Sequence, residues 1–424
     1  MIKICQKGIF EDAQKLAREN ETKAKRAEKS LERIDEMIEE QRLRVDEARA
    51  GVAAIDAENA SLAQALDFQA YTKQTPFPET GPDYGKGFFR LEGTLIPDSL
   101  KGNRYDRLPF SYKSIVRKPV WDLSKSSAGL SIRFLSNSTA ISVKWKILND
   151  FTMNHMAETG IKGVDLYYKN ENGWQYVNTG RPQGIDNEYL LIDNMTEKSR
   201  EFKIFLPLYD GVENIEVGIN TTSFIKKVEK NIKKPIIFYG TSITQGGCAS
   251  RPGMAHTNII SRKLDIDVIN FGFSGNGRME EPIAKLISET DPAFYVIECM
   301  PNMISPENVS KNTIPLVNTI RKKNPDSPII FIDLFKTTFL VLDKKAHIDT
   351  EAMNLALKNE YQKMIDIGYK NIFYIESGNA LGLDQEGTVD GVHFTDLGFM
   401  RYADFLLKKF KEFELTDFKN NSKP

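Results

Sequence analysis

The sequence predicts a three-layer α/β/α domain, preceded by a β-rich domain and by a long amino-terminal helix. Three patterns support this. After residue 235, apolar strands alternate with helical stretches; before it, short runs alternate apolar and polar residues; and the first part of the chain repeats an apolar residue at a 3-4 spacing. These periodicities are typical of a parallel sheet with covering helices, of half-buried strands and of a coiled coil.

The α/β/α prediction rests on residues 235–415. Helical patterns separate five apolar runs. The runs begin near Ile236, Asp267, Phe294, Ile329 and Asn371. A further helical pattern follows His393. Alternation of this kind builds a parallel sheet that is covered on both faces and joined by right-handed crossovers.

Residues 1–70 are predicted to form a coiled-coil helix. Mostly apolar residues keep the 3-4 spacing from Phe10 to Leu66, and charged residues occupy most other positions. A helix without a partner cannot bury this stripe, so we expect self-association or a helical hairpin. Asn20, Gln41 and Asn59 interrupt the stripe and are expected to fix the register or the number of chains. A solitary solvated helix is the alternative.

Residues 72–225 are predicted to form a β-sandwich. Period-two alternation at close spacing, with turn residues between the runs, is typical of that architecture. The runs cover residues 130–135, 140–145, 202–206 and 215–219. The aromatic residues of this domain either pack in its core, which we favour, or form a platform on which sugars stack. They are Trp121, Trp145, Trp174, Tyr167 and Tyr168. The polar stretch 226–231 predicts the boundary to the next domain.

The composition is that of a soluble globular protein. Of 424 residues, 41% are apolar and 27% charged, and the net charge is −1. Because there is no excess of basic charge, we expect neither nucleic acid nor a membrane surface as a partner. Cys5, Cys248 and Cys299 follow no disulfide or metal spacing, which predicts reduced thiols. The sequence shows no signal-peptide pattern and no run of ~18 apolar residues, so the cytoplasm is expected for the chain as given, with export, as in relatives, the alternative.

Three of the predicted strands end in residues that suit a reaction site. Ser242 lies in the turn after the first strand, Gly275 in the glycine-rich turn after the second, and Asn302 after the third. His393 lies further on, three residues after Asp390. Because the carboxyl ends of parallel strands meet at one edge of the sheet, we expect these side chains to come together there. Each one alone is also an ordinary turn residue.

Ser, Gly, Asn and His in this order resemble the four blocks of the SGNH hydrolases, the GDSL-type esterase superfamily, over residues 235–412. The resemblance implies a flavodoxin-like sheet. It also implies a catalytic triad, with Ser242 as nucleophile, His393 as general base and acid, and Asp390 as the residue that orients the imidazole. The backbone N–H groups of Ser242 and Gly275 and the side-chain amide of Asn302 would form the oxyanion hole.

A second block supports the same family. Residues 163–167 match the GxDLY signature of a β-rich domain that precedes the catalytic domain in one branch of these hydrolases. The sequence departs from the common pattern in two places: Thr241 replaces an Asp, and residues 300–303 read Met-Pro-Asn-Met instead of Gly-x-Asn-Asp. The two methionines predict a more apolar pocket wall. Of the other histidines, His155 and His347 lack a catalytic context, and His256 is a candidate for the pocket border.

The resemblance implies a serine esterase that hydrolyses small O-acyl esters, and the GxDLY branch favours acetyl esters of carbohydrates. An acyltransferase to an alcohol acceptor and an inactive glycan-binding protein are the alternatives. The intact Ser242, Asn302, Asp390 and His393 argue against loss of activity. No group of His, Cys and Asp has the sequence spacing of metal ligands, so no metal and no cofactor are expected. The coiled coil is expected to make a homo-oligomer.

Overall fold

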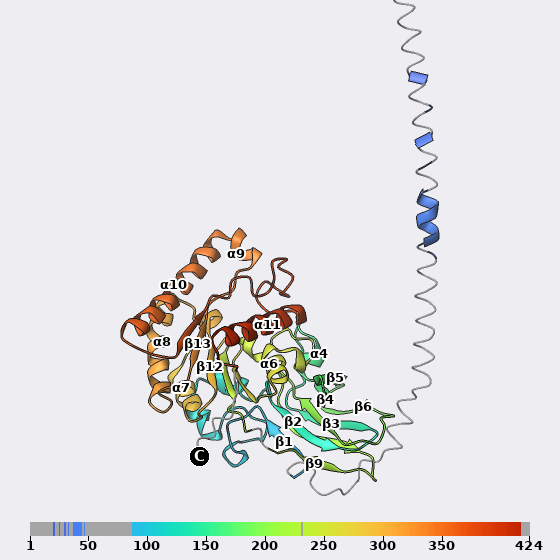
Figure 1. Cartoon of the computed structure of the whole chain (residues 1–424), viewed down its shortest axis with the longest axis horizontal. Coiled ribbons are helices and arrows are strands. Elements are labelled where there is room, and N and C mark those ends of the chain that lie inside the picture. Colours follow the sequence, from blue (N-terminus) through green and yellow to red (C-terminus); the bar gives the residue numbers. More distant parts are fainter. Residues whose placement is uncertain are drawn as a thin grey trace, which may run out of the picture. The chain divides into compact units, whose positions relative to one another are not determined.

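The computed structural model describes residues 87–229 and 232–416, together with residues 20–21, 25, 29–30, 33, 37–44 and 46 (Figure 1). Met1–Pro76 and Phe77–Pro424 are two separate compact units. The described residues of the first unit are helical and exposed. Most of the coiled coil predicted for residues 1–70 falls outside the described residues, and its pairing stays a prediction.

A parallel sheet of five strands, in the order β11-β10-β12-β13-β14, forms the centre of the second unit. These strands are β10 (Ile236–Gly240), β11 (Val268–Gly272), β12 (Phe294–Glu298), β13 (Ile329–Ile332) and β14 (Ile372–Ile375). Their starts agree with the predicted ones. The chain runs from β10 outward to β11 and then back across to β12, so the strand order reverses between β10 and β12. Such reversals are where open α/β sheets of this order hold their sites.

Helices cover both faces of this sheet (Figure 1). One layer contains α7 (Glu281–Ser288), α8 (Pro306–Arg321) and α10 (Lys344–Asp366), and the other contains α6 (His256–Leu264) and α11 (Asp396–Glu412). Along β10, Ile237 and Tyr239 pack under the first layer, whereas Ile236 and Phe238 pack under the second. A sheet buried on both faces explains why its strands read as continuous apolar runs. The predicted mixed α/β fold with a parallel sheet is confirmed.

Two antiparallel sheets precede the parallel one. The larger contains β1 (Arg90–Glu92), β2 (Ser131–Ser136), β7 (Arg200–Phe205), β4 (Val164–Asn170) and β5 (Gly173–Gly180), with β9 (Ile225–Lys227) also paired to β2. The smaller contains β6 (Asp186–Ile192), β3 (Ile141–Ile147) and β8 (Val212–Ile219). One apolar core takes Phe134 and Leu166 from the first sheet and Val143 and Trp145 from the second.

Short helices complete the fold: α3 (Lys118–Leu123), α4 (Glu158–Ile161), α5 (Ser242–Gln245) and α9 (Thr338–Leu342). The first two residues of the stretch 226–231, which is predicted as a domain boundary, lie at the end of strand β9. Trp145 and Tyr167 are 2% exposed and Trp121 and Trp174 are 8% exposed, which favours core packing over an open sugar platform. Among the described residues, no helix has the length and apolar character that crossing a bilayer requires.

Candidate active site

The candidate active site begins at the turn between β10 and α5. A Cβ atom on Gly240 would lie 1.9 Å from Oγ1 of Thr244, so only glycine fits where the strand ends. Thr241 caps the helix, because its side chain accepts a hydrogen bond from the backbone N–H of Ile243 and its own N–H donates to Oγ1 of Thr244. This capping box fixes Ser242, which is 6% exposed, as the first residue of α5 at the carboxyl edge of the sheet.

His393 and Asp390 meet Ser242 at this edge. The Nε2 atom of His393 lies 2.9 Å from Oγ of Ser242, and its Nδ1 lies 2.7 Å from Oδ2 of Asp390. The other carboxylate oxygen of Asp390 accepts hydrogen bonds from the backbone N–H groups of Val392 and His393. Burial raises the pKa of Asp390, but these hydrogen bonds outweigh it and lower the pKa to about 2. An ionised carboxylate only accepts, so Nδ1 carries the proton and Nε2 offers its lone pair to the serine.

Asn302 follows β12, on the other side of the strand-order reversal. Its Oδ1 accepts a hydrogen bond from the backbone N–H of Gly277 at 3.2 Å, and its Nδ2 has no acceptor among the described residues. A Cβ atom on Gly277 would lie 1.9 Å from the carbonyl oxygen of Gly240. The turn after β11 therefore packs directly against the turn that carries Ser242.

Gly275 lies two residues before this contact. It is exposed with a φ of +69°, and a Cβ atom there would meet nothing within 4 Å. A glycine at 275 therefore suits the left-handed backbone conformation, and Gly277 makes the close packing contact with Gly240.

A pocket opens beside the nucleophile turn, between the ends of β10, β12 and β13. It is lined by Thr241, Ile243, Glu298, Pro301, Ile332, Asp333, Phe335, Phe394 and Tyr402. Met300 and Met303 do not line it, because both are 1% exposed and belong to the core under α8. The predicted methionine wall is wrong; Pro301, between them, faces the pocket.

Glu298 at the base of this pocket is buried and accepts three hydrogen bonds. The donors are Oγ1 of Thr244 at 2.8 Å, Nε2 of His256 at 3.1 Å and the hydroxyl of Tyr402 at 2.6 Å. Burial raises the pKa of Glu298, but His256 and these hydrogen bonds lower it below its usual value. His256, a candidate for the pocket border, is fully buried beneath Glu298. That expectation is wrong.

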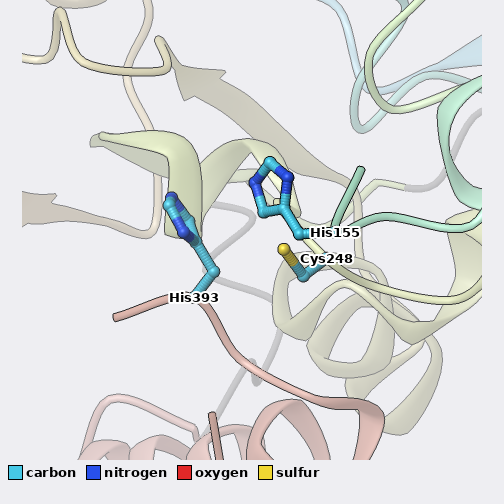
Figure 2. Close-up of side chains that lie close together, drawn as sticks. All are labelled: His155, Cys248 and His393. Carbon is cyan, nitrogen blue, oxygen red and sulfur yellow. The ribbon is translucent and has the colours of Figure 1, made fainter. Parts of the chain in front are cut away.

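His155, which the sequence did not single out, lies beside His393. The two imidazole rings are 5.6 Å apart between centroids (Figure 2). His155 comes from the loop between β3 and α4, so the antiparallel part of the protein reaches this site. Cys248, in the loop after α5, is the third member of this group. Burial and the nearby Asp390 carboxylate raise the pKa of its thiol to about 12, so in the metal-free protein the thiol is protonated and a poor nucleophile at neutral pH.

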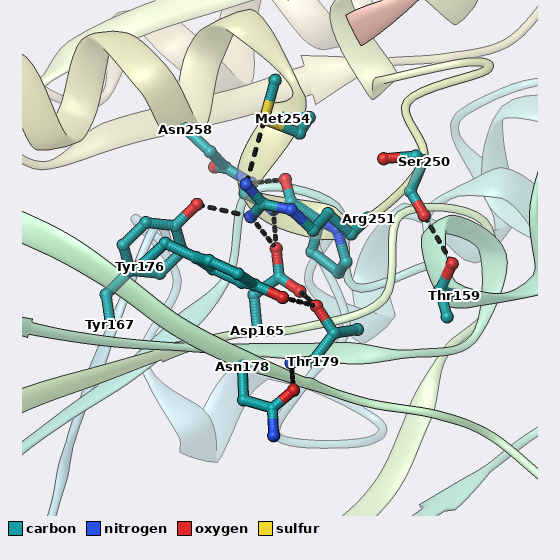
Figure 3. Close-up of polar contacts among 12 residues, drawn as sticks. Thr159, Asp165, Tyr167, Tyr176, Asn178, Thr179, Ser250, Arg251, Met254 and Asn258 are labelled. Carbon is teal, nitrogen blue, oxygen red and sulfur yellow. Dashed lines mark hydrogen bonds and ion pairs between the residues drawn. The ribbon is translucent and has the colours of Figure 1, made fainter. Parts of the chain in front are cut away.

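The GxDLY signature ties the same two parts together (Figure 3). Asp165, on β4, is fully buried and accepts hydrogen bonds from Oγ1 of Thr179, from Nη1 of Arg251 and from the backbone N–H of Gly253. Arg251 also donates to the hydroxyl of Tyr167 at 2.6 Å. Arg251 and Gly253 belong to the loop between α5 and α6, so the signature holds the segment that follows Ser242.

The parallel sheet and the polar side chains at its carboxyl edge are the features of an α/β hydrolytic enzyme. Residues 233–411 match the GDSL-like lipase/acylhydrolase family, and residues 85–225 match the domain found at the N-terminus of SGNH-hydrolase-type esterases. A crystal structure of a GDSL-like lipase from Bacteroides ovatus is 34% identical, with a TM-score of 0.72 over 76% of this chain and 95% of that chain. The chain belongs to the GDSL-like lipase/acylhydrolase family and is an esterase of that type.

Two more distant structures share the fold. A salicylyl-acyltransferase from a tetracycline biosynthetic pathway is 15% identical, with a TM-score of 0.66 over 78% of this chain and 96% of that chain. A family two carbohydrate esterase from Clostridium thermocellum, in complex with cellohexaose, is 13% identical, with a TM-score of 0.50 over 68% of this chain and 94% of that chain. A search of curated proteins finds no match.

Proposed function

We propose that the protein is a serine esterase that removes small O-acyl groups, with acetyl esters of carbohydrates as its substrates. One observation carries the proposal. Nε2 of His393 lies 2.9 Å from Oγ of Ser242, while Nδ1 of the same ring lies 2.7 Å from an ionised Asp390. This is the distance at which a general base takes a hydroxyl proton.

In the proposed first step, Oγ of Ser242 attacks the acyl carbon as its proton passes to Nε2 of His393. Asp390 stabilises the imidazolium and keeps the ring in the tautomer that the reaction needs. The imidazolium then returns the proton to the departing sugar oxygen, and an acyl-enzyme remains. Water repeats the sequence: its proton goes to Nε2, its oxygen joins the acyl carbon, and Ser242 leaves with the proton from His393.

We propose three donors for the oxyanion. The backbone N–H of Ser242 lies at the first turn of α5, where helix N–H groups lack partners inside the helix. Asn302 is oriented by its Oδ1, which Gly277 holds, so that Nδ2 is left to donate. The backbone N–H of Gly275 is the third. Fixed donors of this kind act on charge that develops only in the transition state.

The substrate class rests on two supports. The pocket beside the nucleophile turn combines apolar walls from Ile243, Pro301 and Phe335 with the carboxyl groups of Glu298 and Asp333. We take this lining to suit a short uncharged acyl group better than an anionic one. The fold is shared with a carbohydrate esterase, and we extend that substrate class to this chain. We also propose that residues 85–225 form a β-sandwich, because its two sheets contribute to one core. Residues 1–70 are proposed to join the chains into a homo-oligomer.

The test is hydrolysis of p-nitrophenyl esters of increasing acyl length and of acetylated xylooligosaccharides. We expect acetyl esters to react fastest and Ser242→Ala to lower kcat by ~10⁴-fold or more without unfolding the protein. Ser310→Ala, which changes an exposed serine on α8, is the matched control. A Ser242→Ala protein with normal turnover would refute the assignment. Acyl transfer to an added alcohol at the expense of hydrolysis would identify the acyltransferase alternative.

A further inference from the structure

Three side chains that are remote in the sequence lie close together beside Ser242 (Figure 2). His155, Cys248 and His393 each offer one potential metal-ligand atom, and these atoms all lie within 4.8 Å of one another. They come from the β3–α4 loop, the loop after α5 and the segment after β14. Sequence spacing did not reveal the group because each segment supplies a single ligand.

Each imidazole has an oxygen atom within hydrogen-bonding distance of its Nδ1, as is typical of metal-binding histidines. Nδ1 of His155 lies 3.0 Å from Oδ1 of Asn154, and Nδ1 of His393 lies 2.7 Å from the Asp390 carboxylate. An oxygen acceptor at Nδ1 fixes the tautomer that leaves Nε2 as the lone-pair atom, and carbonyl or carboxylate partners of this kind are typical behind zinc ligands. The negative charge of Asp390 also favours a cation in front of His393.

Cys248 is held in a conformation that few side chains adopt. Its φ is +73°, in the left-handed region that a residue other than glycine occupies only when its surroundings enforce it. The residue is 7% exposed, and its sulfur lies close to both histidines. Other non-glycine residues of the described chain also adopt a positive φ, but here this backbone conformation places the thiol beside both histidines.

We propose that His155, Cys248 and His393 form an inhibitory site for a soft divalent cation, with Zn²⁺ as the best match. Two imidazole nitrogens and one sulfur are a zinc ligand set that leaves a fourth position for water. A tetrahedral ion needs ligand atoms about 3.3 to 3.6 Å apart, so side-chain movements that shorten the present separations by up to about 1.5 Å complete the site. The thiol proton leaves to solvent as the thiolate binds. Zinc then takes the lone pair of His393 that would accept the Ser242 proton, so ester hydrolysis stops.

The inhibition rests on the proposed role of His393, but zinc binding does not, so the experiment measures the two separately. The full-length protein is freed of metal with EDTA, and ZnCl₂ is titrated in by calorimetry. Co²⁺ is then added to look for the absorption band of a cobalt–thiolate bond. Turnover of p-nitrophenyl acetate is measured at each zinc concentration and divided by the metal-free rate of the same variant. His155→Ala and Cys248→Ser are compared with His347→Ala, an exposed histidine on α10.

We expect one Zn²⁺ per chain, inhibition that EDTA reverses, and a thiolate band with Co²⁺. His155→Ala and Cys248→Ser should each weaken binding and inhibition by about tenfold or more, and His347→Ala should change neither. If Cys248→Ser does not fold, the cobalt–thiolate band of the wild type and the zinc affinity of His155→Ala still test the metal site. Absence of zinc binding by the folded wild type, or equal affinity in His155→Ala, would overturn the proposal. Zinc binding by a protein without esterase activity would instead contradict the proposed function and leave the metal site standing.

Discussion

Replacing Asp165 by Asn tests whether the GxDLY carboxylate holds the loop that follows Ser242. The carboxylate is fully buried and has three donors within 2.8 Å, two of them, Arg251 and Gly253, in that loop. Asparagine keeps the shape but removes the charge and turns one acceptor into a donor, which leaves the largely buried Arg251 guanidinium without its counterion. Removing one partner of a buried ion pair costs about 3–5 kcal/mol, so we expect a loss of that size in the free energy of unfolding.

The same variant should also lose catalytic rate. The loop carries Ser250, whose backbone N–H donates to Asp396 at 2.9 Å and whose hydroxyl also contacts that carboxylate, three residues after His393. Asp165, the loop and the His393 segment thus form one chain of contacts. We expect kcat to fall more than KM rises at a temperature where the variant is folded, because the reacting groups and not the substrate contacts are displaced.

Urea unfolding followed by tryptophan fluorescence measures the first effect, and p-nitrophenyl acetate turnover measures the second. Asp349→Asn is the matched control, because Asp349 pairs with Lys345 at 2.7 Å on the exposed surface of α10 and should contribute less than about 1 kcal/mol. A double-mutant cycle with Arg251→Met should give a coupling energy of about 1–3 kcal/mol. If the free energy of unfolding of Asp165→Asn lies within about 0.5 kcal/mol of the wild-type value, the carboxylate does not hold the loop and the reasoning fails.

Three further predictions follow from the site and its surroundings. Asn302→Ala should lower kcat about a hundred-fold with little change in KM, because an oxyanion donor acts in the transition state. Deleting residues 1–70 should reduce the mass measured by light scattering towards that of a monomer and leave turnover per chain unchanged, because the site lies within Phe77–Pro424. Asp267→Asn should stabilise the protein at pH 8 and not at pH 3. Burial and Glu92 raise the pKa of Asp267 from 3.8 to about 6. The protonated carboxyl therefore contributes stability below pH 3.8, and this contribution is lost as the pH rises through 6. The loss in the free energy of unfolding is at most about 3 kcal/mol.

Each of these has an outcome that contradicts it. Asn302→Asp keeps an acceptor for Gly277 but has no donor, so it should be as slow as Asn302→Ala; normal turnover in either variant would exclude an oxyanion role. An unchanged mass after the deletion would mean that another surface assembles the chains. Urea unfolding of Asp267→Asn at both pH values decides the third, and an equal effect at pH 3 and pH 8 would show that ionisation of Asp267 is not the cause.

The parallel sheet was predictable because strands that are buried on both faces appear in the sequence as continuous apolar runs. Val268–Gly272 and Phe294–Glu298 are fully buried strands and read as apolar runs between helical stretches. The position of Ser242 followed from the same logic. Even the departure at Thr241 has a local explanation, because Thr and Asp both cap a helix through a side-chain oxygen.

What the sequence could not predict depends on contacts between distant segments. His155 has no local signal, since its place beside His393 results from how the antiparallel part packs on the sheet. The methionines of residues 300–303 read as pocket residues, but the 3-10 turn Met300–Asn302 points Met300 into the core. The strand β5 also escaped prediction, because its burial does not alternate along Gly173–Gly180.

The buried carboxylate on β4 has a bearing on how proteins of this design can be recombined. A chimera that joins the amino-terminal half of one protein to the hydrolase half of another must keep Asp165 together with Arg251. The contact of Thr159 with the carbonyl of Ser250 is less demanding, because every residue supplies a backbone carbonyl. If one half is exchanged and the ion-pair partner is missing from the other, a charged side chain is left without its partner. For this enzyme, the antiparallel part and the hydrolase part should therefore be exchanged together and not the hydrolase part by itself.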